Sequence, residues 1–552
     1  MKKIINIICL ITALLALTVS CDKKGKQDAV FVEDEAIKYN QKFDGTDNVI
    51  VIDGKKLKNN YLAKIPLDSL EGRDILVQMS CEMMIEDPTG TESMVSWKIN
   101  EPNENFPTLF EDKITPGKWI YFKSETSTML GPKRSITLNA MGSQKQNLKI
   151  YLKNFKYNVI YDESDETAVK VDWKDAPSLW QAYKDYFDYF GLAVGYKGEL
   201  NTSEIQNGLK HQVNCYTMGN EFKPDFIFNW QKVTQTVDFT AENGKSYKVP
   251  ATIDFGSAKE CLKIAKDNGF IMRGHVLVWH NQTPDWFFRV NYSQNKNDAF
   301  VDKQTMNARL EWYIKTMMKF VDEFEKTENN GNHIIKYWDV VNEAVSDNAT
   351  AAKWVRENSN WYEIYGNEEF IINAFRYANK YAPKDVLLTY NDYNEYVPAK
   401  RDAIYTLVQE IKATKDARID VVGMQAHVKI DWPSIANAND SFEAAVQKYT
   451  SLGVDVQVTE LDIANGKQRY NSQKLREVYK KYFEMFIRNR KTDAKNGIIG
   501  VTIWGTTDDR TWLNALGEYS GSRQYPLLFN ADYSVKPAFY GVLEAAQDAK
   551  GN

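Results

Sequence analysis

Residues 337 to 344 read Tyr337-Trp-Asp-Val-Val-Asn-Glu-Ala344, a short apolar run that closes in polar residues. Seven further segments have the same pattern of an apolar run that ends in polar or aromatic residues. Near-continuous apolar runs of this length are typical of parallel strands that are covered on both faces. The other seven are Phe190 to Val194, Val213 to Tyr216, Phe270 to His275, Val386 to Asn391, Val421 to Gln425, Val456 to Glu460 and Ile499 to Trp504.

Between residues 176 and 548 these runs alternate with helical patterns. Eight such units predict an α/β fold, a (β/α)8 TIM barrel with insertions. The alternative is an open, doubly wound sheet, but no glycine-rich phosphate loop opens any of the units. In a barrel the catalytic side chains come from the C-terminal ends of several strands. The residues that close the runs are therefore the candidates for chemistry.

Residues 41 to 160 have a different pattern, in which short alternating segments are broken by turn residues. Ile75 to Met83 and Leu148 to Phe155 alternate apolar and polar residues, as half-buried strands do. We expect a small all-β sandwich that is jelly-roll-like and precedes the barrel, with residues 161 to 175 as a charged linker. The segments Pro116 to Phe122 and Ile150 to Tyr157 resemble parts of jelly-roll carbohydrate-binding modules. A sandwich that binds no ligand is the alternative.

The N-terminus has the pattern of an export signal. In residues 1 to 20 two lysines precede an apolar stretch, which is shorter than the ~20 residues of a membrane-spanning helix. The segment Leu17-Thr-Val-Ser-Cys21 resembles a bacterial lipobox, which implies a lipid on Cys21 and anchoring in the cell envelope, with the outer membrane as the expected site. Residues 21 to 40 would then be a tether. Secretion in soluble form is the alternative.

Composition narrows the function class. The chain has 552 residues, 69 basic against 74 acidic, so its net charge of -5 does not point to nucleic acid. Outside the N-terminal segment, Cys81, Cys215 and Cys261 form an odd trio, which is no disulfide framework. We expect Cys261 to be buried on a helix that begins with a capping box of Ser257 and Glu260. No closely spaced Cys or His pair predicts a metal, and no cofactor is expected.

Polar motifs close or follow six of the predicted strands. They are Gly219-Asn-Glu-Phe-Lys223, His275-Val-Leu-Val-Trp-His-Asn-Gln282, Asn342-Glu343, Gln425-Ala-His427, Glu460-Leu-Asp462 and Trp504-Gly505. In this order they resemble the motifs of family 10 glycoside hydrolases, typified by endo-β-1,4-xylanases. The resemblance covers most of residues 176 to 548. It implies an enzyme that binds xylan or a related β-1,4-glycan.

The resemblance implies a retaining mechanism that uses two glutamates. Such enzymes hold their carboxyl groups about 5 to 5.5 Å apart. Glu460 would attack the anomeric carbon while Glu343 protonates the leaving oxygen. The charge on Glu460 should raise the proton affinity of Glu343 until the sugar esterifies Glu460, after which Glu343 can act as base toward water.

The remaining matched residues support the glutamates or bind sugar. By the resemblance, Asn342 bonds the sugar 2-hydroxyl, and His427 and Asp462 hold the nucleophile. Trp512 is assigned only by its spacing from Trp504, so simple packing is its alternative role. Tyr393 would line the leaving-group side. The residues expected to bind substrate are Asn220, Lys223, His275, Trp279, Gln282, Tyr393, Gln425, Trp504 and Trp512.

The chain departs from the family pattern beside this site. Gly219 stands where family members carry a glutamate that bonds a sugar on the non-reducing side, and Glu221 is the nearest replacement. The connection after Lys223 is long, and Val237 to Val249 reads as a hairpin with an Asn-Gly turn. The hairpin either walls the substrate cleft or lies on the surface.

The substrate is less determined than the reaction. The same mechanism on cellulose or mixed-linkage β-glucan is one alternative to xylan. Capture of glycan by a surface lipoprotein without cleavage is another, against which both glutamates argue. The oligomeric state is not predicted.

Overall fold

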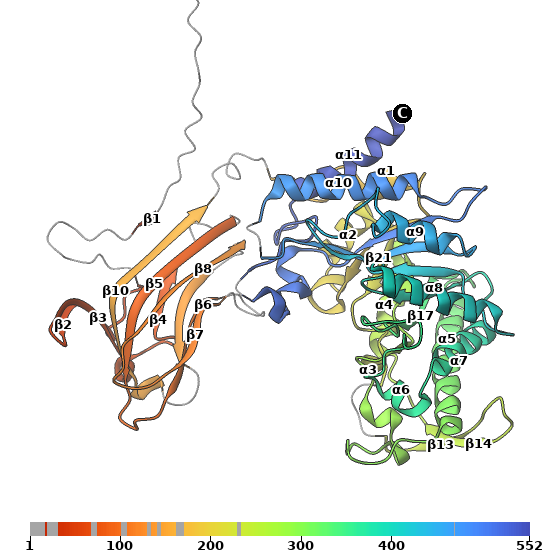
Figure 1. The fold of residues 1–552 in the computed structure, drawn as a ribbon, viewed down its shortest axis with the longest axis horizontal. Coiled ribbons are helices and arrows are strands. Elements are labelled where there is room, and N and C mark those ends of the chain that lie inside the picture. The colour runs from red at the N-terminus through yellow and green to blue at the C-terminus, as the bar shows by residue number, and fades with distance from the viewer. Residues whose placement is uncertain are drawn as a thin grey trace, which may run out of the picture.

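The computed structural model describes residues 17–18, 31–67, 74–100, 108–129, 134–140, 145–161, 170–228, 233–467, 470–520 and 522–551. Cys21 and all of the predicted signal peptide except residues 17 and 18 lie outside these ranges. The described residues pack around two large, separate hydrophobic cores. Figure 1 shows the corresponding bodies, a sandwich in red and orange and a barrel in yellow to blue. No described helix is both long and apolar enough to cross a membrane.

The N-terminal body is an antiparallel sandwich of two sheets, as predicted. One sheet has the order β2-β3-β10-β5-β8 and the other β4-β9-β6-β7. Their bounds are β2 Ile37–Phe43, β3 Thr46–Asp53, β4 Ala63–Pro66, β5 Asp74–Glu86, β6 Ser93–Asn100, β7 Thr108–Ile114, β8 Ile120–Met129, β9 Ser135–Ala140 and β10 Lys149–Tyr161. A two-residue strand, β1 Leu17–Thr18, pairs with β10.

The sandwich begins earlier than the sequence predicts. Phe31 is buried in its core, and β2 begins at Ile37, inside the segment expected to be a tether. The reason is that β2 is an edge strand in which half-buried and exposed residues alternate. A strand that buries so little apolar surface looks like a hydrophilic linker in the sequence.

The C-terminal body is a closed parallel barrel, which confirms the predicted (β/α)8 fold. The eight strands are β11 Tyr189–Val194, β12 Cys215–Met218, β15 Ile271–Gly274, β17 Ile335–Asn342, β18 Leu387–Asp392, β19 Val421–Met424, β21 Asp455–Ala464 and β22 Ile498–Ile503. The barrel closes because β11 pairs with both β12 and β22, and β15 pairs with both β12 and β17. Short strands β16 Val278–Trp279 and β20 His427–Lys429 pair with β17 and β21.

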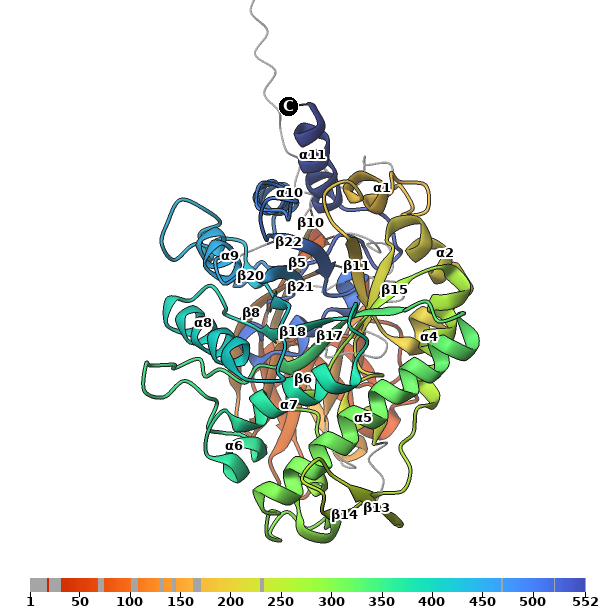
Figure 2. The same cartoon turned by 90° about the vertical axis from the view of Figure 1, so that its right-hand side faces the viewer.

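Helices surround the strands (Figure 2). Within the described residues each barrel strand is followed by a helix of nine residues or more. The short helix α1 precedes β11, and the short helices α3 and α6 lie in the connections. The bounds are α1 Leu179–Tyr183, α2 Ser203–Gln212, α3 Pro224–Ile227, α4 Gly256–Asn268, α5 Lys303–Glu328, α6 Asn360–Tyr365, α7 Glu369–Tyr381, α8 Pro398–Ala413, α9 Phe442–Thr450, α10 Ser472–Arg488 and α11 Pro537–Gly551.

Two local features of the barrel differ from expectation. Trp173 is buried in the barrel core against Gly208, where a Cβ would come within 2.0 Å of the indole, so the packed body starts before residue 176. Helix α4 begins at Gly256 and has no side-chain cap, because Ser257 already lies inside its first turn. The predicted capping box is therefore wrong. Cys261 is buried as predicted, and Cys81, Cys215 and Cys261 are all free thiols.

The predicted hairpin is confirmed as β13 Thr236–Thr240 and β14 Ser246–Pro250, with Gly244 at φ +76° in the turn. It packs beside α5, where Lys315 Nζ lies 5.4 Å from the Phe239 ring centre. The glycine is required in this turn because other residues rarely adopt a positive φ.

Candidate active site

A pocket of about 700 Å³ opens where the barrel strands end. Of the predicted catalytic, supporting and substrate-binding residues of the barrel, all except Asp462 line it. The hairpin β13–β14 contributes no lining residue, which favours the surface role left open by the sequence. The residues that line it as predicted are Asn220, Lys223, His275, Trp279, Gln282, Asn342, Glu343, Tyr393, Gln425, His427, Glu460, Trp504 and Trp512.

Glu343 stands directly after β17 in a strained backbone conformation. Its φ is +56°, which side-chain-bearing residues rarely adopt. Two contacts hold it there: its amide donates to Asn391 O at 2.9 Å, and Arg356 Nε donates to its carbonyl at 2.7 Å. Strain that the surroundings enforce in this way is common at functional sites, where it directs a side chain.

The surroundings of the Glu343 carboxyl favour its protonated form. Trp279 Nε1 donates to Oε2 at 2.9 Å, and Gln425 Nε2 donates to Oε1 at 3.0 Å. Burial raises the pKa of Glu343, and the negative charges of Asp392 and Glu460 raise it further, against the two hydrogen bonds. A carboxyl of this kind keeps a proton to donate.

The surroundings of Glu460, in β21, favour the ionised form. Its side chain is 6% exposed, with Asn391 Nδ2 at 2.7 Å from Oε1 and His427 Nε2 at 3.3 Å from Oε2. Burial alone would raise the pKa of Glu460, but the His427 hydrogen bond and the positive charges of His275 and His427 lower it to about 2. The pKa values of these two glutamates are therefore shifted in opposite directions within one pocket.

Behind Glu460 lies a chain of polar contacts. His427 Nδ1 lies 2.9 Å from Asp462 Oδ2, and Trp512 Nε1 donates to the same oxygen at 2.9 Å. Burial would lower the pKa of His427, but the charges of Asp462 and Glu460 raise it to about 10. Trp512 is 41% exposed in the pocket wall, so it both lines the site and fixes Asp462.

Asn391 links the two glutamates and was not among the predicted site residues. Its Nδ2 donates to Glu460 Oε1 and lies 2.9 Å from the Asn342 side chain, while Thr459 Oγ1 donates to its Oδ1 at 2.6 Å. Gly423 leaves space for this amide, since a Cβ there would approach Asn391 Oδ1 to 2.4 Å. Its position at the close of the fifth apolar run was the available signal.

Lys223 and its neighbours form one wall of the pocket. Lys223 Nζ donates to Gln282 Oε1 at 2.8 Å and lies 4.9 Å from the Trp279 ring centre. Gln282 Nε2 in turn donates to Asn220 Oδ1 at 3.3 Å. Burial lowers the pKa of Lys223, although nearby carboxylates oppose the shift. These donors and acceptors suit the hydroxyls of a sugar.

His275 and Tyr393 both line the pocket. His275 Nδ1 lies 2.8 Å from Asp339 Oδ2, and its ring centre is 5.5 Å from that of Trp504. The Tyr393 hydroxyl donates to Asp347 and accepts from Arg356 at 3.0 Å. Each side chain is thus held by a charged partner.

Glu221 does not replace the carboxylate missing at Gly219. It accepts from the backbone amides of Tyr196 at 3.1 Å and Asn220 at 3.3 Å, and it does not line the pocket. Glu199 lines the pocket instead, together with Thr506 and Arg510. No sequence motif marked these three residues, because they stand in the loops after β11 and β22.

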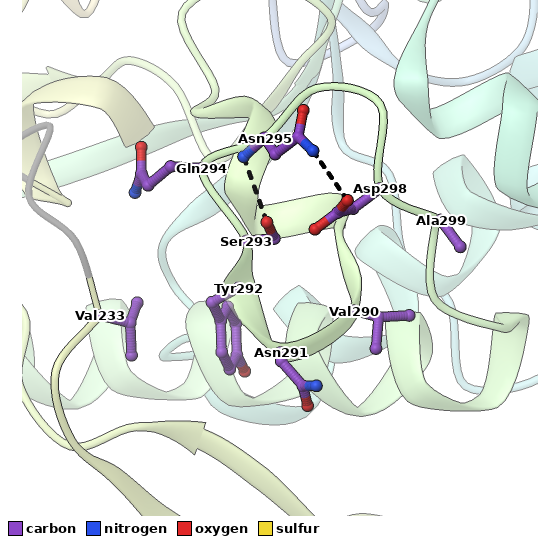
Figure 3. Close-up of a pocket in the computed structure, with 9 residues that line it drawn as sticks. All are labelled: Val233, Val290, Asn291, Tyr292, Ser293, Gln294, Asn295, Asp298 and Ala299. Atoms are coloured by element: carbon purple, nitrogen blue, oxygen red, sulfur yellow. Dashed lines mark hydrogen bonds between the residues drawn. The ribbon is translucent and has the colours of Figure 1, made fainter.

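A second pocket, of about 650 Å³, lies in the loop that follows β16 (Figure 3). Asn295 there bonds Ser293 at 3.1 Å and Asp298 at 2.9 Å. Asp298 is the one carboxyl group among its lining residues. This pocket has no pair of acidic groups for catalysis. Among the described residues no group of His, Cys, Asp and Glu could hold a metal ion.

Comparison with known proteins agrees with this geometry. A family model described as "Glycosyl hydrolase family 10" matches residues 178–545. Endo-1,4-beta-xylanase Y of Acetivibrio thermocellus is 32% identical over 472 residues, which cover 82% of this chain and 40% of that protein. A putative endo-1,4-beta-xylanase of Caldicellulosiruptor saccharolyticus is 37% identical over 57% of this chain and 97% of its own length.

Two solved structures are similar as well. The CBM22-1 and GH10 modules of Clostridium thermocellum endo-1,4-beta-D-xylanase 10B, complexed with xylohexaose, share 27% identity with a TM-score of 0.56 and 92% coverage of both chains. An intracellular xylanase of Thermoanaerobacterium saccharolyticum with bound xylotetraose shares 30% identity, with a TM-score of 0.53, over 67% of this chain and 99% of that one. Because the family model matches most of the chain, over the barrel that carries both glutamates, the chain belongs to glycosyl hydrolase family 10.

Proposed function

We propose that this protein is a retaining endo-β-1,4-xylanase that hydrolyses internal bonds of xylan. The observation that carries the proposal is the pair of glutamates with opposite pKa shifts in one pocket, Glu343 raised and Glu460 lowered to about 2. A retaining glycosidase requires one carboxylic acid and one carboxylate of this kind.

The reaction follows from these protonation states. Glu460 attacks the anomeric carbon, the glycosidic C–O bond breaks, and the Glu343 proton moves to the departing oxygen. The glycosyl ester on Glu460 removes a negative charge, so the pKa of Glu343 falls and its carboxylate takes a proton from water. That water attacks the anomeric carbon and releases Glu460. The product keeps the starting anomeric configuration.

Neighbouring groups hold the nucleophile and the sugar in place. His427 and Asp462 orient Glu460, and Asn342 bonds the 2-hydroxyl of the sugar that is attacked. Most of the sugar-binding residues lie on the non-reducing side, and Tyr393 lies on the leaving-group side. The residues proposed to bind substrate are Asn220, Lys223, His275, Trp279, Gln282, Gln425, Trp504, Trp512 and Tyr393.

The names of the relatives support xylan as the substrate. The chain spans only 40% of the length of the Acetivibrio thermocellus relative, so the substrate of this chain needs a direct test. We expect purified protein to release more reducing ends from xylan than from carboxymethyl cellulose or mixed-linkage β-glucan. Greater activity on either glucan would reassign the substrate. Xylan binding without any product over hours would favour a glycan-capturing role.

His427 controls the acid limit of activity. Because it lowers the pKa of Glu460, His427→Gln should raise that pKa and move the acid limb of the kcat/KM profile to higher pH. The sign follows from the requirement for ionised Glu460: activity is lost as pH falls through its pKa. The pH profile of initial rates on an aryl xylobioside measures this effect. An unmoved acid limb would contradict the role of His427.

We further propose that the sandwich binds glycan on the outer face of the sheet β2-β3-β10-β5-β8. Tyr121 is 66% exposed there, and the Trp119 ring lies 4.1 Å from Lys153 Nζ. Glu82 lies between Lys153 and Tyr121 in the strand register. Flat rings beside charged groups suit a pyranose chain. The Clostridium thermocellum structure, which contains a CBM22-1 module, supports this role.

Affinity electrophoresis of the full chain in xylan gels tests the sandwich. The Trp119→Ala/Tyr121→Ala double variant should migrate faster than wild type in xylan and equally without it, whereas Trp432→Ala, an exposed tryptophan on the barrel, should migrate as wild type. Equal retardation of all three proteins would favour a spacer role.

The lipobox-like segment carries a separate proposal, that the protein is exported and anchored to the cell envelope, at the outer membrane, through a lipid on Cys21. Incorporation of labelled fatty acid tests it. We expect labelling of the wild type and none of Cys21→Ser. An unlabelled wild type found in the medium would favour soluble secretion.

A further inference from the structure

One corner of the pocket has no part in the proposed mechanism. The loops after β11 and β22 bring together Glu199, in the segment η5 Tyr196–Leu200, and Arg510, at the end of η8 Asp508–Arg510. Both side chains line the pocket that contains the two catalytic glutamates. A carboxylate and a guanidinium therefore lie in reach of a sugar chain that occupies the cleft.

Glu199 is held rigidly. Its side chain is 9% exposed, the Gly195 amide donates to Oε2 at 2.7 Å, and the Thr506 hydroxyl donates to Oε1. The pKa of Glu199 is raised, because burial outweighs the Thr506 hydrogen bond and the Arg510 charge, which lower it. Each carboxylate oxygen has a second lone pair, so both can still accept a hydrogen bond from a ligand.

The guanidinium of Arg510 can donate further hydrogen bonds. Its side chain is 38% exposed, and its Nη1 lies 4.0 Å from Glu199 Oε2, beyond hydrogen-bonding distance. Within the described part of the chain its guanidinium makes no hydrogen bond to another group. An arginine that lines a pocket and has donor groups left over is suited to bind a ligand.

Two glycines that line the pocket, Gly195 and Gly219, leave space in this part of it. A Cβ on Gly219 would meet only Val194 O, at 3.6 Å, so the space beside the strand ends stays free. A Cβ on Gly195 would come within 3.0 Å of Glu199 Oε2 and would crowd the carboxylate. The room left by these two residues allows a ring to approach the Glu199 side chain.

We propose that Glu199 and Arg510 form a clamp for two neighbouring hydroxyls of an uncharged pyranose, on the non-reducing side of the bond that is cleaved. The clamp rests on the proposed function. A vicinal diol is both donor and acceptor, so one hydroxyl donates to the carboxylate while the next accepts from the guanidinium. The Glu199 carboxylate and the Arg510 guanidinium are too far apart for a direct hydrogen bond, and the two hydroxyls connect them. A uronate in this place would be repelled by Glu199.

Aryl β-glycosides with one, two or three xylosyl units test the clamp. We expect Arg510→Ala and Glu199→Gln to lower kcat/KM by about 10- to 100-fold, mainly through KM, on the longer substrates, because a hydrogen bond to a charged group contributes this much. The single-unit substrate should be unaffected. The double variant should lose less than the product of the single losses, because both groups hold the same ring.

Two control variants sharpen the comparison. Lys197→Ala removes an exposed charge from the same loop, outside the pocket lining, and should behave as wild type on all three substrates. Arg510→Lys keeps the charge but loses the planar fork, so it should recover only part of the loss.

Other outcomes overturn the clamp. An equal loss on all three glycosides would mean that Arg510 and Glu199 only support their loops. A loss confined to glucuronate-substituted oligosaccharides would mean that Arg510 binds an anion. If wild-type protein hydrolyses none of the glycosides and no xylan, the proposed function fails instead. Calorimetric titration of xylo- and cello-oligosaccharides into wild type and Arg510→Ala then decides the clamp, which equal affinities would contradict.

Discussion

Replacing Glu460 with alanine is expected to lower kcat on xylan by on the order of 10⁵-fold or more, because the variant lacks the group that forms the glycosyl ester. The carboxylate is held ionised by His427 and oriented by Asn391, and no other carboxylate of the pocket is bonded in this way. Initial rates of reducing-end release from xylan, with circular dichroism to verify folding, measure the effect.

Two further variants make this test specific. Glu460→Gln keeps the volume of the side chain and an oxygen that can accept from Asn391, so it should fold as wild type and be equally inactive. Glu221→Gln alters another buried glutamate near the pocket that does not line it, and should retain most activity. If Glu460→Ala kept more than about one hundredth of wild-type activity, the assignment of the nucleophile would be wrong, since nucleophile losses are far larger.

Replacing Glu343 with alanine should affect two substrates differently. General acid catalysis contributes about 10²- to 10⁴-fold, so hydrolysis of xylan, whose leaving group needs a proton, should fall by this factor. An aryl xylobioside with a good leaving group needs little protonation, so its first step should be spared. A burst of aryl alcohol followed by slow turnover is expected, because no base remains to activate water.

Azide provides the control for this variant. As a small anion that needs no general base, it should enter the space left by Glu343 and restore turnover of the aryl xylobioside, with a glycosyl azide as product. It should not restore activity to Glu460→Ala on this route. Equal failure of Glu343→Ala on both substrates, without azide rescue, would contradict the acid/base assignment.

The burial of a segment determines how well its structure can be predicted from the sequence. The barrel strands are covered on both faces, so they leave continuous apolar runs. Asn342, Glu343 and Glu460 mark where two of those strands, β17 and β21, end or open into the pocket. Strand β2 lies at a sheet edge and buries little, so it read as a tether. Helix α4 begins at Gly256, one residue before Ser257. The spacing of Ser257 and Glu260 alone cannot place the start of a helix to within one residue.

In the active site, too, residues at strand ends could be predicted from the sequence, whereas residues in loops could not. Residues at strand ends are positioned by the barrel, so their roles could be predicted from their order along the chain. Glu199 and Arg510 come from loops whose course depends on tertiary contacts, such as the Thr506 hydrogen bond to Glu199. The sequence revealed a missing carboxylate at Gly219, but only the folded loops place another carboxylate in the pocket.

In the proposed mechanism Glu460 forms a covalent bond to the sugar during each turnover. A 2-deoxy-2-fluoro xylobioside with a good leaving group slows hydrolysis of the ester more than its formation, so the intermediate should accumulate. Mass spectrometry of the intact protein and of its peptides is the direct measurement. We expect one fluoroxylobiosyl group per protein, on the peptide that contains Glu460 and absent from Glu460→Ala. A label on the peptide that contains Glu343, or turnover with an inverted product and no label, would contradict it.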